Sequence, residues 1–178
     1  MRVKGRHGGT LSDRYALADN RQTYIRWPGS TRNRGEYMPR AYATLTLEDA
    51  KRMIGAAEAE AARLGIAYNI AVVDAGGHLL AFVRQDGALI GSIDLAIDKA
   101  KTARIFDKKT SDLAALSQPG QPLYGIQESN AGKVVIFGGG IPVTFNGDII
   151  GAVGASAGTV EQDIAVVEAA ASVIKTGN

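Results

Sequence analysis

Two short glycine-containing links, each flanked by apolar runs, constrain the fold of this chain most strongly. The first, Ala75-Gly76-Gly77, joins "YNIAVVD" (68–74) to "HLLAFVRQ" (78–85), and the second is Asn146-Gly147. Links this short join antiparallel neighbours as β-hairpins. With one more β-like run before the second hairpin, the sequence predicts five strands, at about 68–74, 78–85, 133–137, 141–145 and 148–156.

Helical periodicity and capping signals surround these strands. Thr46 and Asp49 form a near capping box before a helix at 47–64, and Thr159 with Gln162 forms another before a helix ending near residue 175. Two more helices are predicted, at 92–106 with Ser92 as N-cap and at 110–118 capped by Thr110 or Ser111. The order favours an α+β fold, one antiparallel sheet covered by helices, over a doubly wound nucleotide fold.

The positive charge is confined to the first part of the chain. Residues 1–40 hold nine Lys/Arg and three Asp/Glu, whereas the remaining residues hold eleven and fifteen. We expect residues 1–42 to be a basic, disordered extension, or an addition upstream of a true start at Met38, and residues 43–178 to form the folded domain. A nucleic-acid footprint should be a patch on a folded surface, so a nucleic-acid partner is not expected. Neither a signal-peptide core nor a membrane-spanning run is found, so a membrane partner is not expected.

Three glycine clusters accompany the strands: Gly76-Gly77, Gly138–Gly140, and Gly151, Gly154 and Gly158. None has the spacing of a Walker loop or of G-x-G-x-x-G. A glycine in a strand marks close approach of a ligand or of another backbone, and both alternatives stay open. Gly158-Thr159 leads into a helix start that could bind an anion. The alternative is that Thr159 serves only as a cap, since Glu161 and Asp163 already bring negative charge there.

Candidate chemistry is limited by what the chain lacks. It has no cysteine, and apart from His7 in the basic extension its one histidine is His78. A zinc site and a Ser–His–Asp triad are therefore not expected. Haem needs only one or two axial ligands, so His78 could serve, or it could be a half-exposed hairpin residue. Arg84 and Lys99, by default surface charges, would suit a small carboxylate if they converged with the Gly138–Gly140 turn.

Several motifs together resemble the GlcG/HbpS family, which includes the C-terminal domain of PduO-type proteins. They are "LTLEDAK" (45–51), "VVDAGGHLLAFVRQDGA" (72–88), "DLAIDKAKTARIF" (94–106) and "FGGGIPVTFNGDIIGAVGASAGTVEQD" (137–163). The resemblance implies a profilin-like α–β–α sandwich, homo-oligomers, haem binding in some members, and operons for the breakdown of small molecules. The family's usual Ser-Gly-Gly is Ser156-Ala157-Gly158 here, and the added methyl group would tighten a site at that turn.

The resemblance and the residue patterns together predict a ligand-binding accessory protein linked to a catabolic pathway, with haem as the possible cofactor and His78 as its axial ligand. The absence of an export signal favours the cytoplasm. The alternative is a metal-free enzyme acting on a small oxo-acid or aromatic intermediate. The candidate ligand-binding residues are His78, Arg84, Lys99, Gly139, Gly140, Ser156, Gly158 and Thr159.

Overall fold

The computed structural model describes residues 41–174 and shows one antiparallel sheet with helices on both faces. Nearly all of the predicted basic extension, residues 1–40, lies outside the described residues. The sheet has four strands in the order β2-β1-β4-β3, formed by β1 (Asn69–Asp74), β2 (Leu79–Arg84), β3 (Gly140–Phe145) and β4 (Asp148–Ser156). Both predicted hairpins are present, and β1 lies beside β4 in the centre.

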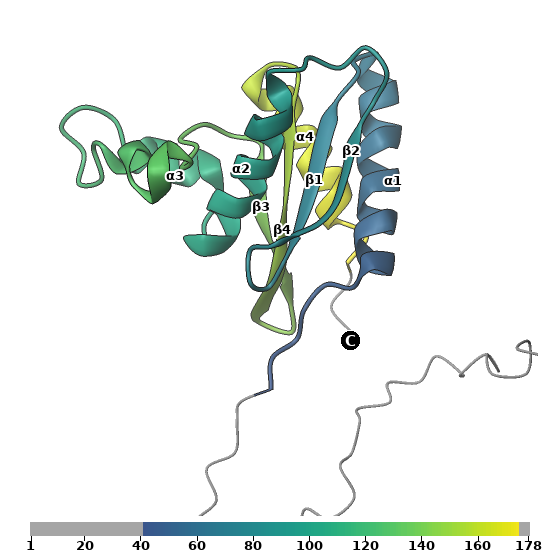
Figure 1. Cartoon of the computed structure of the whole chain (residues 1–178), viewed down its shortest axis with the longest axis horizontal. Coiled ribbons are helices and arrows are strands. Elements are labelled where there is room, and N and C mark those ends of the chain that lie inside the picture. Colours follow the sequence, from purple (N-terminus) through teal and green to yellow (C-terminus); the bar gives the residue numbers. More distant parts are fainter. Residues whose placement is uncertain (1–40, 175–178) are drawn as a thin grey trace, which may run out of the picture. The chain divides into compact units, whose positions relative to one another are not determined.

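The helices separate into two layers (Figure 1). On one face α1 (Leu47–Leu64) and α4 (Val160–Ala171) pack against the larger apolar core, which contains Met53, Ile70 and Val153. On the other face α2 (Ser92–Ile105) packs its alanines against Ala71 and Ala152. This layering agrees with the predicted α–β–α sandwich, while the likeness to profilin stays a prediction.

The predicted strand at 133–137 is absent. Val134 and Val135 are buried, but the Val135 N–H donates to Thr102 Oγ1 of α2 at 3.1 Å, and the same hydroxyl donates to the Lys133 carbonyl at 3.4 Å. Because a helix side chain takes these backbone groups, the segment does not join the sheet. The prediction of five strands was therefore wrong by one.

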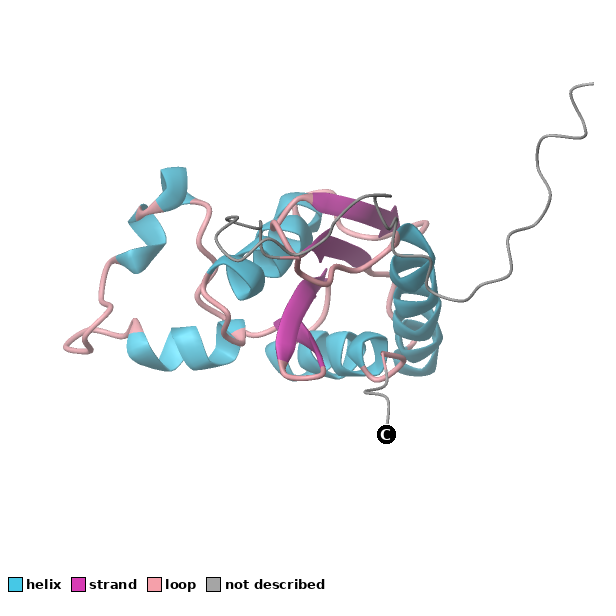
Figure 2. Cartoon of the chain, turned by 90° about the horizontal axis from the view of Figure 1, so that it is seen from below, coloured by secondary structure: helices cyan, strands magenta, loops and turns pink. Residues whose placement is uncertain are grey.

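A helical segment precedes this extended stretch. It contains α3 (Thr110–Leu116) and the short 3-10 helices η2 (Ile126–Glu128) and η3 (Asn130–Gly132), and it lies beyond α2, away from the centre of the sheet (Figures 1 and 2). Neither Thr110 nor Ser111, the two predicted caps of α3, is its N-cap. Lys109 holds that position, and the Thr110 hydroxyl instead accepts from the Gly140 N–H.

The helix ends follow the local signals elsewhere. Both predicted capping boxes, Thr46–Asp49 and Thr159–Gln162, are formed. Ser92 is not the N-cap of α2, since Gly91 holds that position and makes no side-chain cap. α4 ends at Ala171, and residue 175, the predicted end, lies outside the described residues.

Gly154 lets α2 lie directly on β4. A Cβ atom at this position would come within 2.2 Å of the Ala96 carbonyl oxygen and 2.5 Å of the Ala100 nitrogen. These are backbone atoms of α2, so the contact cannot be relieved by turning a side chain. The strand glycine therefore serves the close approach of another backbone.

We predict that Gly154→Ala lowers the free energy of unfolding by about 3 kcal/mol, because overpacking against backbone forces α2 away from the sheet. Urea denaturation measures this loss. Gly55→Ala is the matched control: Gly55 is an exposed glycine inside α1 with nothing within 4 Å of its Cβ position. It should raise the stability by about 0.5–1 kcal/mol. Equal effects of the two substitutions would contradict the role assigned to Gly154.

Candidate functional site

A buried ion pair connects the two helical layers. Lys99 of α2 is 0% exposed, and its Nζ lies 2.6 Å from Oδ2 of Asp163 on α4. Because α2 and α4 cover opposite faces of the sheet, the lysine side chain must pass from one layer to the other. It does so beside Gly139, whose Cβ position lies 2.8 Å from Lys99 Nζ and 2.8 Å from the Asp163 Cβ.

The Lys99 ammonium group is fully surrounded by partners. Besides the carboxylate, it donates to the Ala155 carbonyl at 3.0 Å and lies 4.6 Å from the centroid of the Phe137 ring. Aromatic faces attract ammonium groups, so the ring is a third favourable neighbour beside the carboxylate and the carbonyl. Burial lowers the pKa of Lys99, and the hydrogen bond to Asp163 opposes this shift.

Asp163 fills the anion position at the start of α4. Its Oδ1 accepts from the backbone N–H groups of Ala157 and Gly158, each at 3.1 Å. Thr159 is occupied by its capping box, in which the Gln162 N–H donates to its hydroxyl. The turn "SAGT" therefore binds an anion, as one interpretation of the sequence proposed, but that anion belongs to the protein itself.

A tyrosine lies beneath the same turn. Tyr68 is 0% exposed, and its hydroxyl lies 2.7 Å from the Cβ position of Gly158. Within residues 41–174 this hydroxyl has no hydrogen-bond partner. Burial, and next the nearby negative charge of Asp163, raise the pKa of the phenol, so Tyr68 stays protonated at neutral pH.

The structure brings together five of the eight predicted site residues around this ion pair. Lys99 and the backbone near its ion pair form one centre, to which four others contribute: Gly139, Gly140, Gly158 and Thr159. Ser156 is the buried last residue of β4. Lys99 is not the surface charge that was expected, since α2 turns it inward with Ala96 and Ala103. Asp163, Phe137 and Tyr68 were not predicted as members of this centre. The helical spacing of Lys99 from Ala96 and Ala103 was the available signal.

His78 and Arg84 lie apart from each other. His78 is in the turn before β2, and Arg84 is the last residue of that strand; both are exposed. The His78 N–H donates to Asp74 Oδ1 at 2.9 Å, and its carbonyl accepts from the Asp74 N–H at 2.9 Å. The backbone of the turn is thus fixed, and the exposed imidazole lies against Gly76, whose Cβ position is 3.1 Å from its Nε2.

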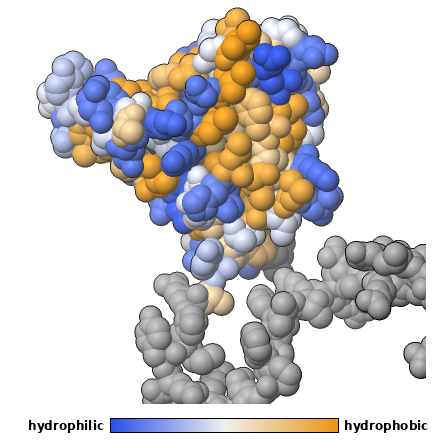
Figure 3. Space-filling model, viewed as in Figure 1, coloured by the Kyte–Doolittle hydropathy of each residue, from blue (hydrophilic) through white to orange (hydrophobic). Residues whose placement is uncertain are grey.

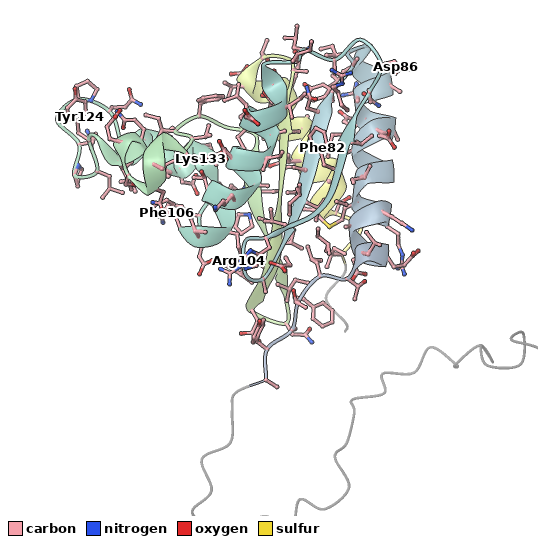
Figure 4. All side chains as sticks on the ribbon, viewed as in Figure 1. Phe82, Asp86, Arg104, Phe106, Tyr124 and Lys133 are labelled. Carbon is pink, nitrogen blue, oxygen red and sulfur yellow. The ribbon has the colours of Figure 1, made fainter. Side chains whose placement is uncertain are left out.

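The surroundings of His78 are partly apolar. The turn rests on the C-terminal end of α2, since the Cβ position of Gly77 lies 3.3 Å from the Ile105 side chain. Ile105 is 39% exposed and Leu79, the next residue after His78, is 51% exposed. Arg104 adds a cation at the same end of α2 and pairs with Asp107 (Figure 4). An exposed imidazole beside apolar side chains and an arginine is a donor set that fits haem, a flat apolar molecule with carboxylate groups.

Other site classes find no support in the described part of the chain. No group of three or more histidine, cysteine or carboxylate side chains within residues 41–174 is placed to hold a metal ion. No helix in that range is long and apolar enough to cross a membrane.

We predict that Lys99→Met lowers the free energy of unfolding by about 3–5 kcal/mol, because it leaves the buried Asp163 carboxylate without its counter-ion. Combining it with Asp163→Asn should cost less than the sum of the two single substitutions, as measured by a double-mutant cycle in urea. The control is Lys109→Met, which removes a pair with Glu168 whose side chains are 51% and 56% exposed. Its effect should stay below about 1 kcal/mol. Additive effects at Lys99 and Asp163 would refute the coupling.

Comparison with known proteins places this geometry in a family. Residues 45–172 match the family described as "Haem degrading protein HbpS-like". An uncharacterized 15.0 kDa protein from the dhaT-dhaS intergenic region of Citrobacter freundii is 46% identical over 128 residues, which are 72% of this chain and 90% of that protein. The corrinoid adenosyltransferase PduO of Salmonella typhimurium is 37% identical over 133 residues, 75% of this chain but only 40% of PduO.

A solved structure supports the same assignment. The crystal structure of a PduOC:heme complex has a TM-score of 0.73 and 36% identity, and the match covers 76% of this chain and 98% of that one. The family match spans nearly the whole described region, so the resemblance inferred from the motifs is confirmed. The chain belongs to the HbpS-like family.

Proposed function

We propose that this protein binds haem at the surface formed by the β1–β2 turn and the C-terminal end of α2. The observation that carries the proposal is the exposed imidazole of His78 on a turn whose backbone Asp74 holds in place. A rigid turn presents an axial ligand at low entropic cost, because little of it must be ordered on binding. The haem complex of the 36% identical PduOC supports the choice of ligand.

The residues around His78 have distinct roles in this proposal. His78 supplies the axial nitrogen, Leu79 and Ile105 supply apolar contact with the macrocycle, and Arg104 supplies a positive charge near the carboxylates. A bound haem would bring an iron centre, whose properties depend on its axial ligand and on solvent access. Since these side chains lie on the surface, one face of the haem would stay open to solvent or to another partner.

An accessory role in catabolism completes the proposal. The family description supports haem as the ligand, and the link to a pathway rests on the relative from the dhaT-dhaS intergenic region. The alternative of a metal-free enzyme has less support. Its proposed carboxylate-binding lysine, Lys99, is 0% exposed and already holds the carboxylate of Asp163.

We predict that the purified full-length protein binds haemin with a shift of the Soret band, and that His78→Ala weakens binding by about tenfold or more, or about 1.4 kcal/mol. Absorbance titration at fixed protein concentration measures both. The matched control is Arg84→Ala, which removes an exposed side chain at the other end of β2 and should leave the affinity unchanged.

The outcomes separate a specific site from adventitious binding. If wild-type protein and His78→Ala bind haemin equally, His78 is not the ligand and the proposed site is wrong. If Arg84→Ala weakens binding as much as His78→Ala does, the binding surface lies elsewhere on β2. Circular dichroism of each variant confirms that the fold is retained.

A further inference from the structure

The two edges of the sheet are unequally protected. Edge strands present unpaired backbone groups to solvent, and proteins usually block them with proline, charge or a covering segment. The β3 edge is blocked in two ways: Pro142 removes a donor in mid-strand, and Thr110 of α3 bonds the backbone N–H of Gly140 at 3.0 Å. The β3 edge is therefore poorly suited to pair with another strand.

The β2 edge carries no such protection. Its sequence, "LLAFVR", has five apolar residues in succession and neither proline nor a charge before Arg84. The hydrogen bond from the Gln85 N–H to the Tyr68 carbonyl sets the alternation of the ladder, so Val83 and Ala81 bond to β1. The N–H and C=O groups of Phe82 and Arg84 consequently point away from the sheet. A register shift affects only the end of the strand near Leu79.

Apolar side chains continue beside this edge. Leu79 is 51% exposed at the start of β2, and Leu89 and Ile90, in the loop after the strand, are 62% and 74% exposed. Figure 3 shows hydrophobic residues gathered on the face that carries β2. A strand edge with free backbone groups and a flanking apolar surface is what β-strand addition requires.

We infer that β2 pairs with β2 of a second copy of this chain, antiparallel about a two-fold axis at Phe82. An isologous contact of this kind needs a strand whose ends complement each other, and this strand satisfies that condition. Pairing Phe82 with Phe82 of the partner subunit sets Arg84 opposite an apolar residue, the partner subunit's Leu80. Within β2 no like charges meet across the axis.

The charge arrangement argues for this register. β2 carries a single charge, Arg84, two residues after Phe82, so the two-fold axis sets the two arginines at opposite ends of the paired strands. The pairing of the strands does not require haem.

The absence of cysteine from the chain allows a direct test. Hydrogen-bonded antiparallel partners have Cα atoms about 5.5 Å apart, within the range that a disulfide spans. Phe82→Cys in the full-length, haem-free protein should therefore form an intermolecular disulfide under mild oxidation. It should do so about tenfold or more faster than Thr144→Cys, an exposed position on the β3 edge, because the paired strands hold the thiols together.

A second variant checks the interface without a thiol. Leu79→Lys places a charge on an exposed site of the β2 edge, so the fold should be retained while the mass measured by light scattering falls at least by half; Thr144→Lys should leave it unchanged. The inference is overturned if the wild-type protein is a monomer at micromolar concentration. It is equally overturned if both cysteine variants cross-link at the same rate, or if Leu79→Lys keeps the wild-type mass. None of these outcomes depends on whether haemin binds, so the interface and the proposed function can fail separately.

Discussion

The Lys99–Asp163 ion pair is the interaction on which the rest of this structure depends. Burying two charges costs several kcal/mol unless both are paired and their remaining hydrogen-bonding groups are satisfied. Here a carboxylate, a carbonyl and an aromatic ring lie around the Lys99 ammonium group. Two backbone N–H groups donate hydrogen bonds to the other oxygen of the Asp163 carboxylate. Gly139 is required where the lysine passes, and the turn at 157–158 must face Asp163. One pair thus determines the path of two loops and joins α2 to α4.

This arrangement separates structural from functional chemistry. The glycine-rich segments, which could have formed a ligand cradle, instead admit a helix backbone at Gly154 and a buried lysine at Gly139. The exposed polar and apolar groups that suit a ligand lie at the other end of α2, around His78. The interior therefore provides a rigid frame, and both proposed binding surfaces, the haem site and the β2 edge, lie along one hairpin.

The sequence predicted those parts of the fold that short-range physics determines. Both hairpins follow from their turn residues, and both capping boxes follow from Thr46 and Thr159. The extra strand at 133–137 was predicted wrongly because its apolar residues are buried as expected, but a side chain distant in sequence, Thr102, takes the backbone N–H of Val135. For the same reason Asp163 was interpreted only as an acidic residue in the first turn of the last helix, because its partner Lys99 is 64 residues away in the sequence. The burial of Lys99 could have been inferred from its spacing to Ala96, whereas its convergence with Asp163 could not.

Hydrogen exchange at the Ala157 and Gly158 amides tests the central role of the ion pair most directly. Gly158 is exposed, and its amide would exchange rapidly if the turn were an ordinary surface loop. If both amides donate to a buried carboxylate held by Lys99, they should exchange only on global unfolding, as slowly as the core amides of β4. Exchange at the rate of an unprotected loop, under conditions where β4 remains protected, would contradict the central role of the ion pair.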